Sequence, residues 1–197
     1  MGAEVRTAGE RVLTARQAEL LDQLEDLFLA EGFAGFTLDD LAVRLRCSKS
    51  TLYALAESKE QLAARVVRHF FRRAAAEVEA RAVDEDDPVL RVTAYLAAVA
   101  SALAPAGPAF RRDLEAFAPA RAVYERHTAL AADRVRELVD EGVAAGRFRR
   151  VHPALVADTV TTLMFRIGRG DTGRATGLSD AAAYRELAAL LLHGITR

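Results

Sequence analysis

The chain of 197 residues contains no tryptophan, a single cysteine, 12 glycines and 5 prolines. The one cysteine, Cys47, excludes an intrachain disulfide and fits a reducing compartment, so we expect a cytoplasmic protein. Because turn-forming residues are scarce and 51% of the residues are hydrophobic, the composition favours an all-helical fold with a sizeable core. The formal net charge of −1 gives no indication of a nucleic-acid or membrane partner.

Segments typical of export or membrane insertion are also lacking. Residues 1–17 mix charges and have no apolar centre, so we expect no secretory signal peptide. The uncharged stretch 92–110 is interrupted by Pro105, Gly107 and Pro108, which predicts a buried helix end and no membrane partner. The acidic run 84–87 precedes a proline and is interpreted as a solvated helix junction.

Hydrophobic residues recur at helical spacing along the chain and show no β-type alternation. In the N-terminal part, a helix is predicted over 16–31, followed by short helices capped by Thr37 and Ser48 and a long helix over 59–82. Asp40 and Gln61 stand at the capping-box positions of the second and fourth helices.

The C-terminal part is predicted to hold five further helices. They span about 88–104, 108–118, 119–145, 153–167 and 180–195. The sequence "GRGDTG" over 168–173 is a literal G-x-G-x-x-G, but nucleotide binding needs a strand before it, so we predict a flexible loop continuing to residue 179. The prediction is thus an all-α protein of about nine helices.

The short second and third helices are joined by "LRCS", which predicts a helix-turn-helix. In such a unit the N-terminal residues of the second helix meet base edges in the major groove, and helix N-termini suit phosphate. The predicted DNA-binding residues are Thr37, Arg46, Lys49, Ser50, Thr51, Tyr53 and Lys59.

Local charge supports this prediction. Residues 41–59 hold four basic residues and one acidic residue, a net charge of +3, whereas residues 1–40 hold three basic and nine acidic residues, a net charge of −6. A positive patch of this kind directs phosphate contacts even when the whole chain is neutral. Lysine occurs only at Lys49 and Lys59, and we hypothesise that a compact ammonium suits a crowded phosphate contact better than a guanidinium does.

The spacing of residues over 16–70 resembles the N-terminal signature of the TetR family of bacterial transcriptional repressors. The matching residues are Leu27-Phe28, Gly32-Phe33, Thr37, Leu41-Ala42, Ser48, Leu52-Tyr53, Ser58-Lys59-Glu60 and Leu62. Two departures stand out. Arg46 occupies the turn position where the family usually has glycine, and Ala54-Leu55-Ala56 replaces an aromatic residue, a histidine and a phenylalanine.

The resemblance implies a helix-turn-helix domain over 15–70 and a ligand-binding and dimerisation domain over 71–197. It further implies a homodimer through the last two helices, an inverted-repeat operator in double-stranded DNA, and a small-molecule effector that releases the operator. A mostly apolar pocket is expected, which does not define the chemical class of the ligand. Candidate ligand-binding residues are His69, Tyr95, Tyr124, His127 and Arg166.

Two other function classes stay open at the level of the sequence. One is a ligand-independent DNA-binding or architectural dimer; the other is an enzyme or carrier that uses the C-terminal cavity. No catalytic constellation, cofactor motif or metal-ligand spacing is present, because the four histidines lie far apart in sequence. Cys47 is interpreted as a small buried residue, with a redox switch as the alternative.

Overall fold

Residues 13–83 and 85–196 are described by the computed structural model. Residues 1–12 lie outside the described residues; they make up most of the N-terminal segment for which we expect no signal peptide. Residue 84, at the start of the acidic run, also lies outside them. Within the described ranges the chain forms ten α-helices and no strand, apart from an isolated antiparallel bridge between Phe148 and Thr196. The prediction of an all-α fold is therefore confirmed.

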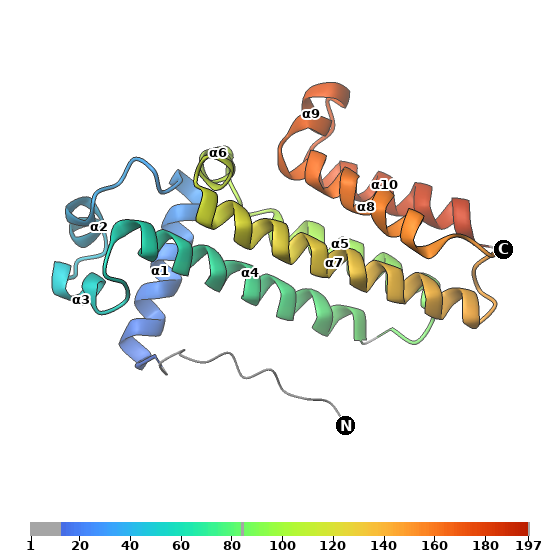
Figure 1. Ribbon diagram of the computed structural model, residues 1–197, viewed down its shortest axis with the longest axis horizontal. Coiled ribbons are helices and arrows are strands. Elements are labelled where there is room, and N and C mark those ends of the chain that lie inside the picture. Colours follow the sequence, from blue (N-terminus) through green and yellow to red (C-terminus); the bar gives the residue numbers. More distant parts are fainter. Residues whose placement is uncertain (1–12, 84, 197) are drawn as a thin grey trace.

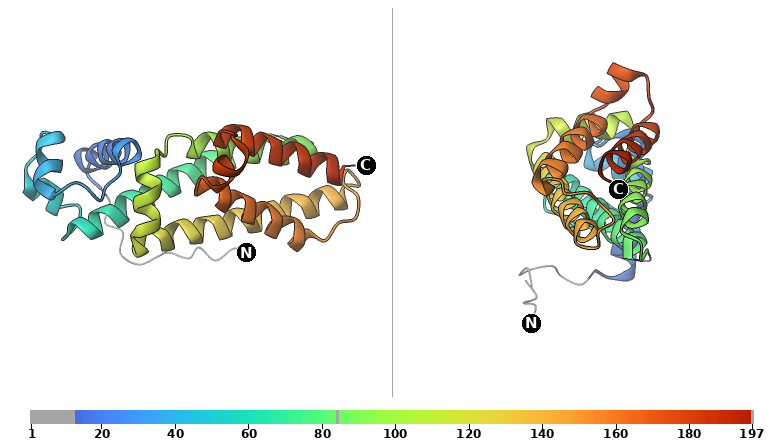
Figure 2. Two further views of the ribbon diagram at one scale, coloured as in Figure 1. Left: turned by 90° about the horizontal axis from the view of Figure 1, so that it is seen from above. Right: turned by 90° about the vertical axis from the view of Figure 1, so that its right-hand side faces the viewer.

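Figure 1 shows the order of the helices along the chain. They are α1 (Ala15–Glu31), α2 (Leu38–Arg44), α3 (Lys49–Tyr53), α4 (Lys59–Val83), α5 (Pro88–Leu103), α6 (Pro108–Ala116), α7 (Ala118–Ala144), α8 (Pro153–Gly168), α9 (Asp171–Thr176) and α10 (Asp180–Ile195). The molecule is elongated, with α2 and α3 at one end and the C-terminal end of α10 at the other (Figures 1 and 2).

Side-chain caps set the helix starts where the sequence predicted them. The Thr37 and Asp40 side chains each bind the other's backbone N–H, which completes a capping box at the start of α2. Ser58 accepts from the backbone N–H of Gln61, as a cap of α4 should. The Gln61 side chain differs from the prediction, because it accepts from the N–H of Glu57 and not from that of Ser58.

The loop predicted over 168–179 is wrong in part, because it contains the helix α9. Two glycines in the left-handed region, Gly170 with φ 72° and Gly177 with φ 75°, bound this helix. They allow the chain to turn abruptly at both ends without a Cβ penalty. One turn and a half of helix between two such glycines has too short an apolar pattern to be recognised from periodicity.

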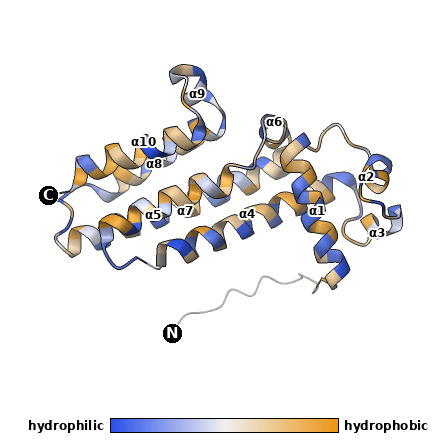
Figure 3. Cartoon of the chain, turned by 180° about the vertical axis from the view of Figure 1, so that it is seen from behind, coloured by the Kyte–Doolittle hydropathy of each residue, from blue (hydrophilic) through white to orange (hydrophobic). Residues whose placement is uncertain are grey.

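Two hydrophobic clusters form the core. The first joins α1, α2, α3 and the N-terminal half of α4 with α6 and includes Leu24, Phe28 and Phe110; the second joins the rest of α4 with α5, α7, α8 and α10. In Figure 3, hydrophilic and hydrophobic residues alternate around α1, α4 and α7, as expected of helices that bury one face. Helix α4 contributes to both clusters, so it connects the two ends of the molecule mechanically.

No single helix in the described ranges is both long and apolar enough to cross a membrane. Helices α5 and α6 reach that length and composition only when taken together, and they are bent by 92° at their junction. Much of α5 is buried in the protein itself, including Val92 and Leu96.

Candidate DNA-binding unit and ligand cavity

The turn between α2 and α3 closes α2 with a Schellman motif. The Cys47 N–H binds the carbonyl of Ala42 at 3.0 Å, and the Arg46 N–H binds that of Val43 at 3.2 Å. Arg46 takes the left-handed position of this motif with φ 49°, the one non-glycine residue with positive φ in the described ranges. The turn therefore has the geometry that glycine favours, and arginine is retained in it at a steric cost of about 1–2 kcal/mol.

Three hydroxyl groups meet at the start of α3. Ser48 caps the helix by accepting from the Thr51 N–H, and its Oγ lies 2.6 Å from that of Ser50 and 2.8 Å from Oγ1 of Thr51. Leu52 is buried beneath them and anchors the helix, while Tyr53 on the other side keeps 51% of its surface exposed. The predicted residues Ser50, Thr51 and Tyr53 thus share one accessible end of the molecule, and their DNA contacts stay predictions.

Both lysines are already engaged within the chain. The Lys49 ammonium lies 2.5 Å from Oδ1 of Asp39, and this hydrogen bond raises the pKa of Lys49 above its usual value. The Lys59 ammonium donates to the carbonyl of Ala34 at 2.7 Å. Lys49 therefore links α3 to α2, and Lys59 links the start of α4 to the loop between α1 and α2.

The charge excess predicted for residues 41–59 is reduced by acidic residues from earlier in the chain. The Arg44 guanidinium forms two hydrogen bonds with the carboxylate of Glu31, at 2.6 and 3.0 Å, and lies over the ring of Phe36. Arg46 makes no ion pair or side-chain hydrogen bond within residues 13–83 and 85–196, and its side chain is exposed. Of the four basic residues in 41–59, Arg46 is thus the one whose side chain can bind a phosphate without first breaking a contact described in the structure.

The loop between α1 and α2 is held from the far side by α6. The Asp113 carboxylate accepts from the backbone N–H groups of Phe33 at 2.5 Å and Ala34 at 2.7 Å. Gly32 makes this approach possible, because a Cβ there would lie 2.6 Å from Oδ2 of Asp113. The role of Asp113 could not be predicted from sequence periodicity, because the N–H groups that it binds lie about eighty positions away in the chain.

His69, predicted to bind ligand, lies at the contact between α1 and α4. Its Nε2 is 2.8 Å from Oδ1 of Asp22 and 3.7 Å from Oε2 of Glu25. Burial raises the pKa of Glu25, and the charge of Arg73, 3.3 Å away, opposes that rise. Arg166 is exposed on α8. Neither His69 nor Arg166 lines the two hollows found in the helical bundle, so the structure does not bring these two residues to the other candidates.

The larger hollow does bring three of the candidates together. It has a volume of about 330 Å³ and is enclosed mainly by α4, α5 and α7, with Tyr95, Tyr124 and His127 in its walls. Phe71 stacks on His127 with ring centroids 5.5 Å apart and lies 5.7 Å from the ring of Tyr124. A smaller hollow of about 50 Å³ shares Phe71 and Tyr124 with it and reaches Tyr184.

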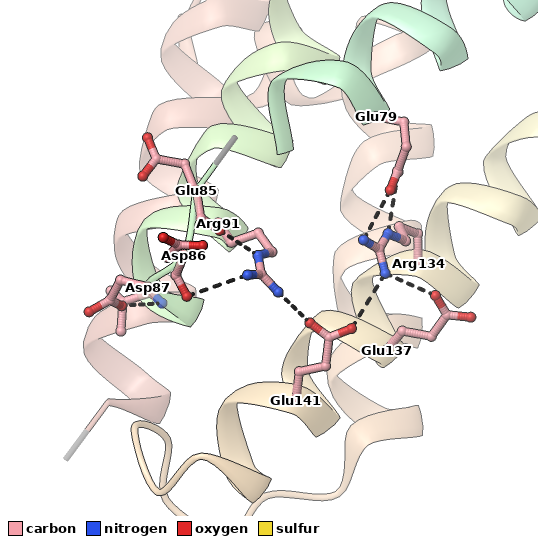
Figure 4. A network of polar contacts seen from close by, with 9 residues as sticks. Glu79, Glu85, Asp86, Asp87, Arg91, Arg134, Glu137 and Glu141 are labelled. Carbon is pink, nitrogen blue, oxygen red and sulfur yellow. Dashed lines mark hydrogen bonds and ion pairs between the residues drawn. The ribbon is translucent and has the colours of Figure 1, made fainter. Parts of the chain in front are cut away.

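A network of charged side chains lies at one edge of the larger hollow (Figure 4). The Arg134 guanidinium binds Glu79 at 3.0 and 3.3 Å, Glu137 at 3.1 Å and Glu141 at 3.7 Å. Glu141 also binds Arg91 at 2.8 Å. The network joins α4, α5 and α7, and sequence reasoning missed it because its members lie on three helices that are well separated along the chain.

The described part of the predicted junction, residues 85–87, is tied into the same region. Arg91 donates to the backbone carbonyl of Glu85 at 2.7 Å, and Asp87 caps α5 through the Val89 N–H. Asp87 also lies 2.5 Å from the guanidinium of Arg147.

Comparison with protein families decides what the N-terminal unit is. Residues 20–66 match the family described as bacterial regulatory proteins, tetR family. This part of the chain is a TetR-family DNA-binding domain. The match covers most of α1, the helix-turn-helix and the first turns of α4, so the family's DNA-binding function and lack of enzymatic activity agree with the sequence expectation.

Solved structures of transcriptional regulators share the fold over nearly the whole chain. The PfmR regulator of Thermus thermophilus is 23% identical with a TM-score of 0.66, covering 90% of this chain and 99% of that one. A TetR-family regulator from Agrobacterium tumefaciens is 16% identical with a TM-score of 0.72, covering 93% and 98%. A protein from Saccharomonospora viridis in complex with choline is 16% identical with a TM-score of 0.76, covering 92% and 98%. No curated protein sequence matches this chain.

The described ranges contain no group of three or more His, Cys, Asp or Glu side chains placed to hold a metal ion. Cys47 is partly buried, packs against the N-terminal cluster and has its thiol pKa raised by burial. A raised pKa disfavours the reactive thiolate, so the structural interpretation of Cys47 fits better than a redox switch.

Proposed function

We propose that this regulator is a repressor that binds a palindromic operator as a homodimer and releases it when a small molecule enters the larger hollow. The observation that carries the proposal is the course of α4. Lys59 at its start contacts the loop that precedes the helix-turn-helix, and Phe71, Ala74 and Val78 farther along line the hollow. A ligand that shifts α4 would therefore move the DNA-binding end of the molecule.

A second connection supports the same coupling. Helix α6 contributes Phe110 and Leu114 to the smaller hollow and Asp113 to the loop between α1 and α2. Helices α4 and α6 thus both connect the hollows to the DNA-binding unit. They link the two proposed domains, 15–70 and 71–197. Coupling of this kind between two sites is typically worth about 1–3 kcal/mol.

Helices α8 and α10 support the proposed dimer. Each buries one face against the protein, including Val160 and Ile167 on α8 and Leu187 on α10. Each also exposes a leucine on another face, with Leu155 64% and Leu190 70% exposed. Figure 3 shows hydrophobic residues along both helices. Pairing these faces with those of a second copy would form a four-helix interface with two-fold symmetry.

A known ligand complex of this fold and the expected location of the protein also support the proposal. The neighbour from Saccharomonospora viridis was solved in complex with choline, so a protein of this fold does bind a small molecule. A DNA operator and a free cysteine both fit a cytoplasmic site of action.

The operator is tested by selecting bound fragments from random or genomic DNA with the purified full-length protein. We expect an enriched inverted repeat whose half-sites are spaced by whole helical turns of about 10 bp. Direct repeats or single half-sites would contradict the two-fold dimer. An inverted repeat that no small molecule releases would favour the ligand-independent DNA-binding dimer.

A further inference from the structure

The charge at the edge of the larger hollow limits what it can bind. Both carboxylate oxygens of Glu79 are bound by Arg134, whose remaining contacts are with Glu137 and Glu141. The ion pairs of Arg134 and Arg91, drawn in Figure 4, set three carboxylates against two guanidinium groups. An anionic ligand would have to displace Glu79 from Arg134 and then face these carboxylates, so its binding is disfavoured.

The interior of the hollow carries no compensating positive charge. Burial lowers the pKa of His127, and Arg126 and Arg72 lower it further, so the imidazole is neutral at pH 7. Neither arginine is among the lining residues. The other walls are largely apolar, with Val99, Leu103 and Met164 among them.

The aromatic groups do not form a cage for a cation either. A cation is held by aromatic faces that lie free within about 6 Å of it. Here the ring of Phe71 stacks on His127 at 5.5 Å, and Tyr124 meets Phe165 edge to face at 5.4 Å. The rings are turned to one another, and Glu79 at the rim is already paired, so a buried ammonium would lose its hydration without an equivalent partner.

One polar group in the wall does lack a partner. The Tyr95 hydroxyl makes no hydrogen bond within the described part of the chain, although Tyr95 is only 4% exposed. Burial raises the pKa of Tyr95 to about 12, with Glu79 adding to the rise, so the hydroxyl stays protonated and acts as a donor. Its oxygen is not among the fully buried atoms that lack a partner, so the hydroxyl is accessible from the hollow, where an acceptor on a ligand can take its hydrogen bond in place of water.

We propose that the hollow takes an uncharged, largely apolar molecule that offers one hydrogen-bond acceptor to the Tyr95 hydroxyl. The inference rests on the proposed function, in which this hollow is the effector site. A volume of about 330 Å³ suits a molecule of modest size, such as a medium-chain ketone or alcohol.

The test compares three probes with similar ten-carbon chains by isothermal titration calorimetry on the full-length protein: decan-2-one, decanoate and decyltrimethylammonium. We expect decan-2-one to bind at least about tenfold more tightly than either charged probe, because each charge loses its hydration in the hollow without a partner. Filling the hollow by Ala131→Phe should abolish this binding. Tightest binding of decanoate or of the ammonium, or no binding of the ketone, would overturn the inference.

Tyr95→Phe removes the donor and keeps the ring, so it should weaken ketone binding by about fivefold, as the loss of one neutral hydrogen bond does. Tyr184→Phe is the matched control, because Tyr184 is also a buried tyrosine but lines only the smaller hollow. Equal effects of the two substitutions would contradict the role of Tyr95. Ketone binding that depends on Tyr95 but does not release the operator would leave this inference standing and refute the effector step of the proposed function.

Discussion

The ammonium of Lys49 lies 2.5 Å from the carboxylate of Asp39, so a DNA phosphate at this position competes with an acidic side chain of the same protomer. Both side chains are at least half exposed, and the pair is therefore weak and easily exchanged. Asp39 holds Lys49 in place at the start of α3 and at the same time reduces the positive potential there.

We predict that Asp39→Asn tightens operator binding by about fivefold at low salt, because it removes a negative charge beside the DNA and frees Lys49. Lys49→Ala should weaken binding and lower the slope of log affinity against log salt by about 1. Both effects are measured by fluorescence anisotropy over a salt series. Unchanged affinity in both variants would place Lys49 and Asp39 outside the DNA interface.

Arg46 is retained in a backbone conformation that glycine adopts without strain, which points to a use for its side chain. We predict that Arg46→Gly raises the free energy of unfolding by about 1 kcal/mol while it weakens operator binding and lowers the salt slope by about 1. Stability is measured by chemical denaturation and affinity by anisotropy.

Arg46→Asn is the matched control, because asparagine tolerates the left-handed region and carries no charge. It should reproduce the loss of affinity. If Arg46→Gly binds DNA as tightly as the natural protein, Arg46 makes no useful phosphate contact.

At the scale of helices, α6 connects the bundle to the DNA-binding unit. Its Asp113 accepts from two backbone N–H groups of the loop between α1 and α2, and the carbonyl of Ala34 in that loop accepts from Lys59. The Gly107 N–H at the start of α6 also binds the carbonyl of Leu29 at the end of α1. These contacts fix the loop that leads into Thr37 and α2.

We predict that Asp113→Ala lowers the free energy of unfolding by about 1–3 kcal/mol, because two N–H groups lose their acceptor. Operator affinity should fall as well at temperatures where the variant is fully folded, since the loop then no longer holds α2 and α4 in register. Thermal denaturation and anisotropy measure the two effects.

Glu115→Ala on the same helix serves as the control, because its ion pair with Arg169 is half exposed and contributes little. Should Asp113→Ala keep full operator affinity, α6 would have no part in positioning the DNA-binding unit.

At the scale of the whole molecule, α8 and α10, which carry the exposed Leu155 and Leu190, lie away from α2 and α3 of the helix-turn-helix (Figure 1). A dimer formed there would leave both DNA-binding ends accessible. We predict that Leu190→Glu converts the dimer to monomers in analytical ultracentrifugation and reduces operator affinity, because each half-site is then bound alone.

Leu90→Glu on α5 is the control, because Leu90 is 54% exposed but does not belong to α8 or α10. It should leave the sedimentation unchanged. Dimers in both variants would move the interface away from Leu190.

The sequence by itself determined the helical fold, most helix starts and the DNA-binding unit. These depend on local physics: the periodicity of apolar residues, and caps such as Thr37, Ser48 and Asp87 that bind N–H groups two or three residues away. The helix α9 was not predicted, because two left-handed glycines define its ends and its apolar pattern is too short to show a helical period.

Only the tertiary structure decided which side chains meet. It brought Tyr95, Tyr124 and His127 to one hollow, and placed His69 beside Asp22 instead. It also gave Lys49 and Lys59 partners within the chain, which the count of charges along the sequence could not include. The physical reason is the same in each case: ion pairs and cavities depend on distances across helices, and the helix period carries no information about those distances.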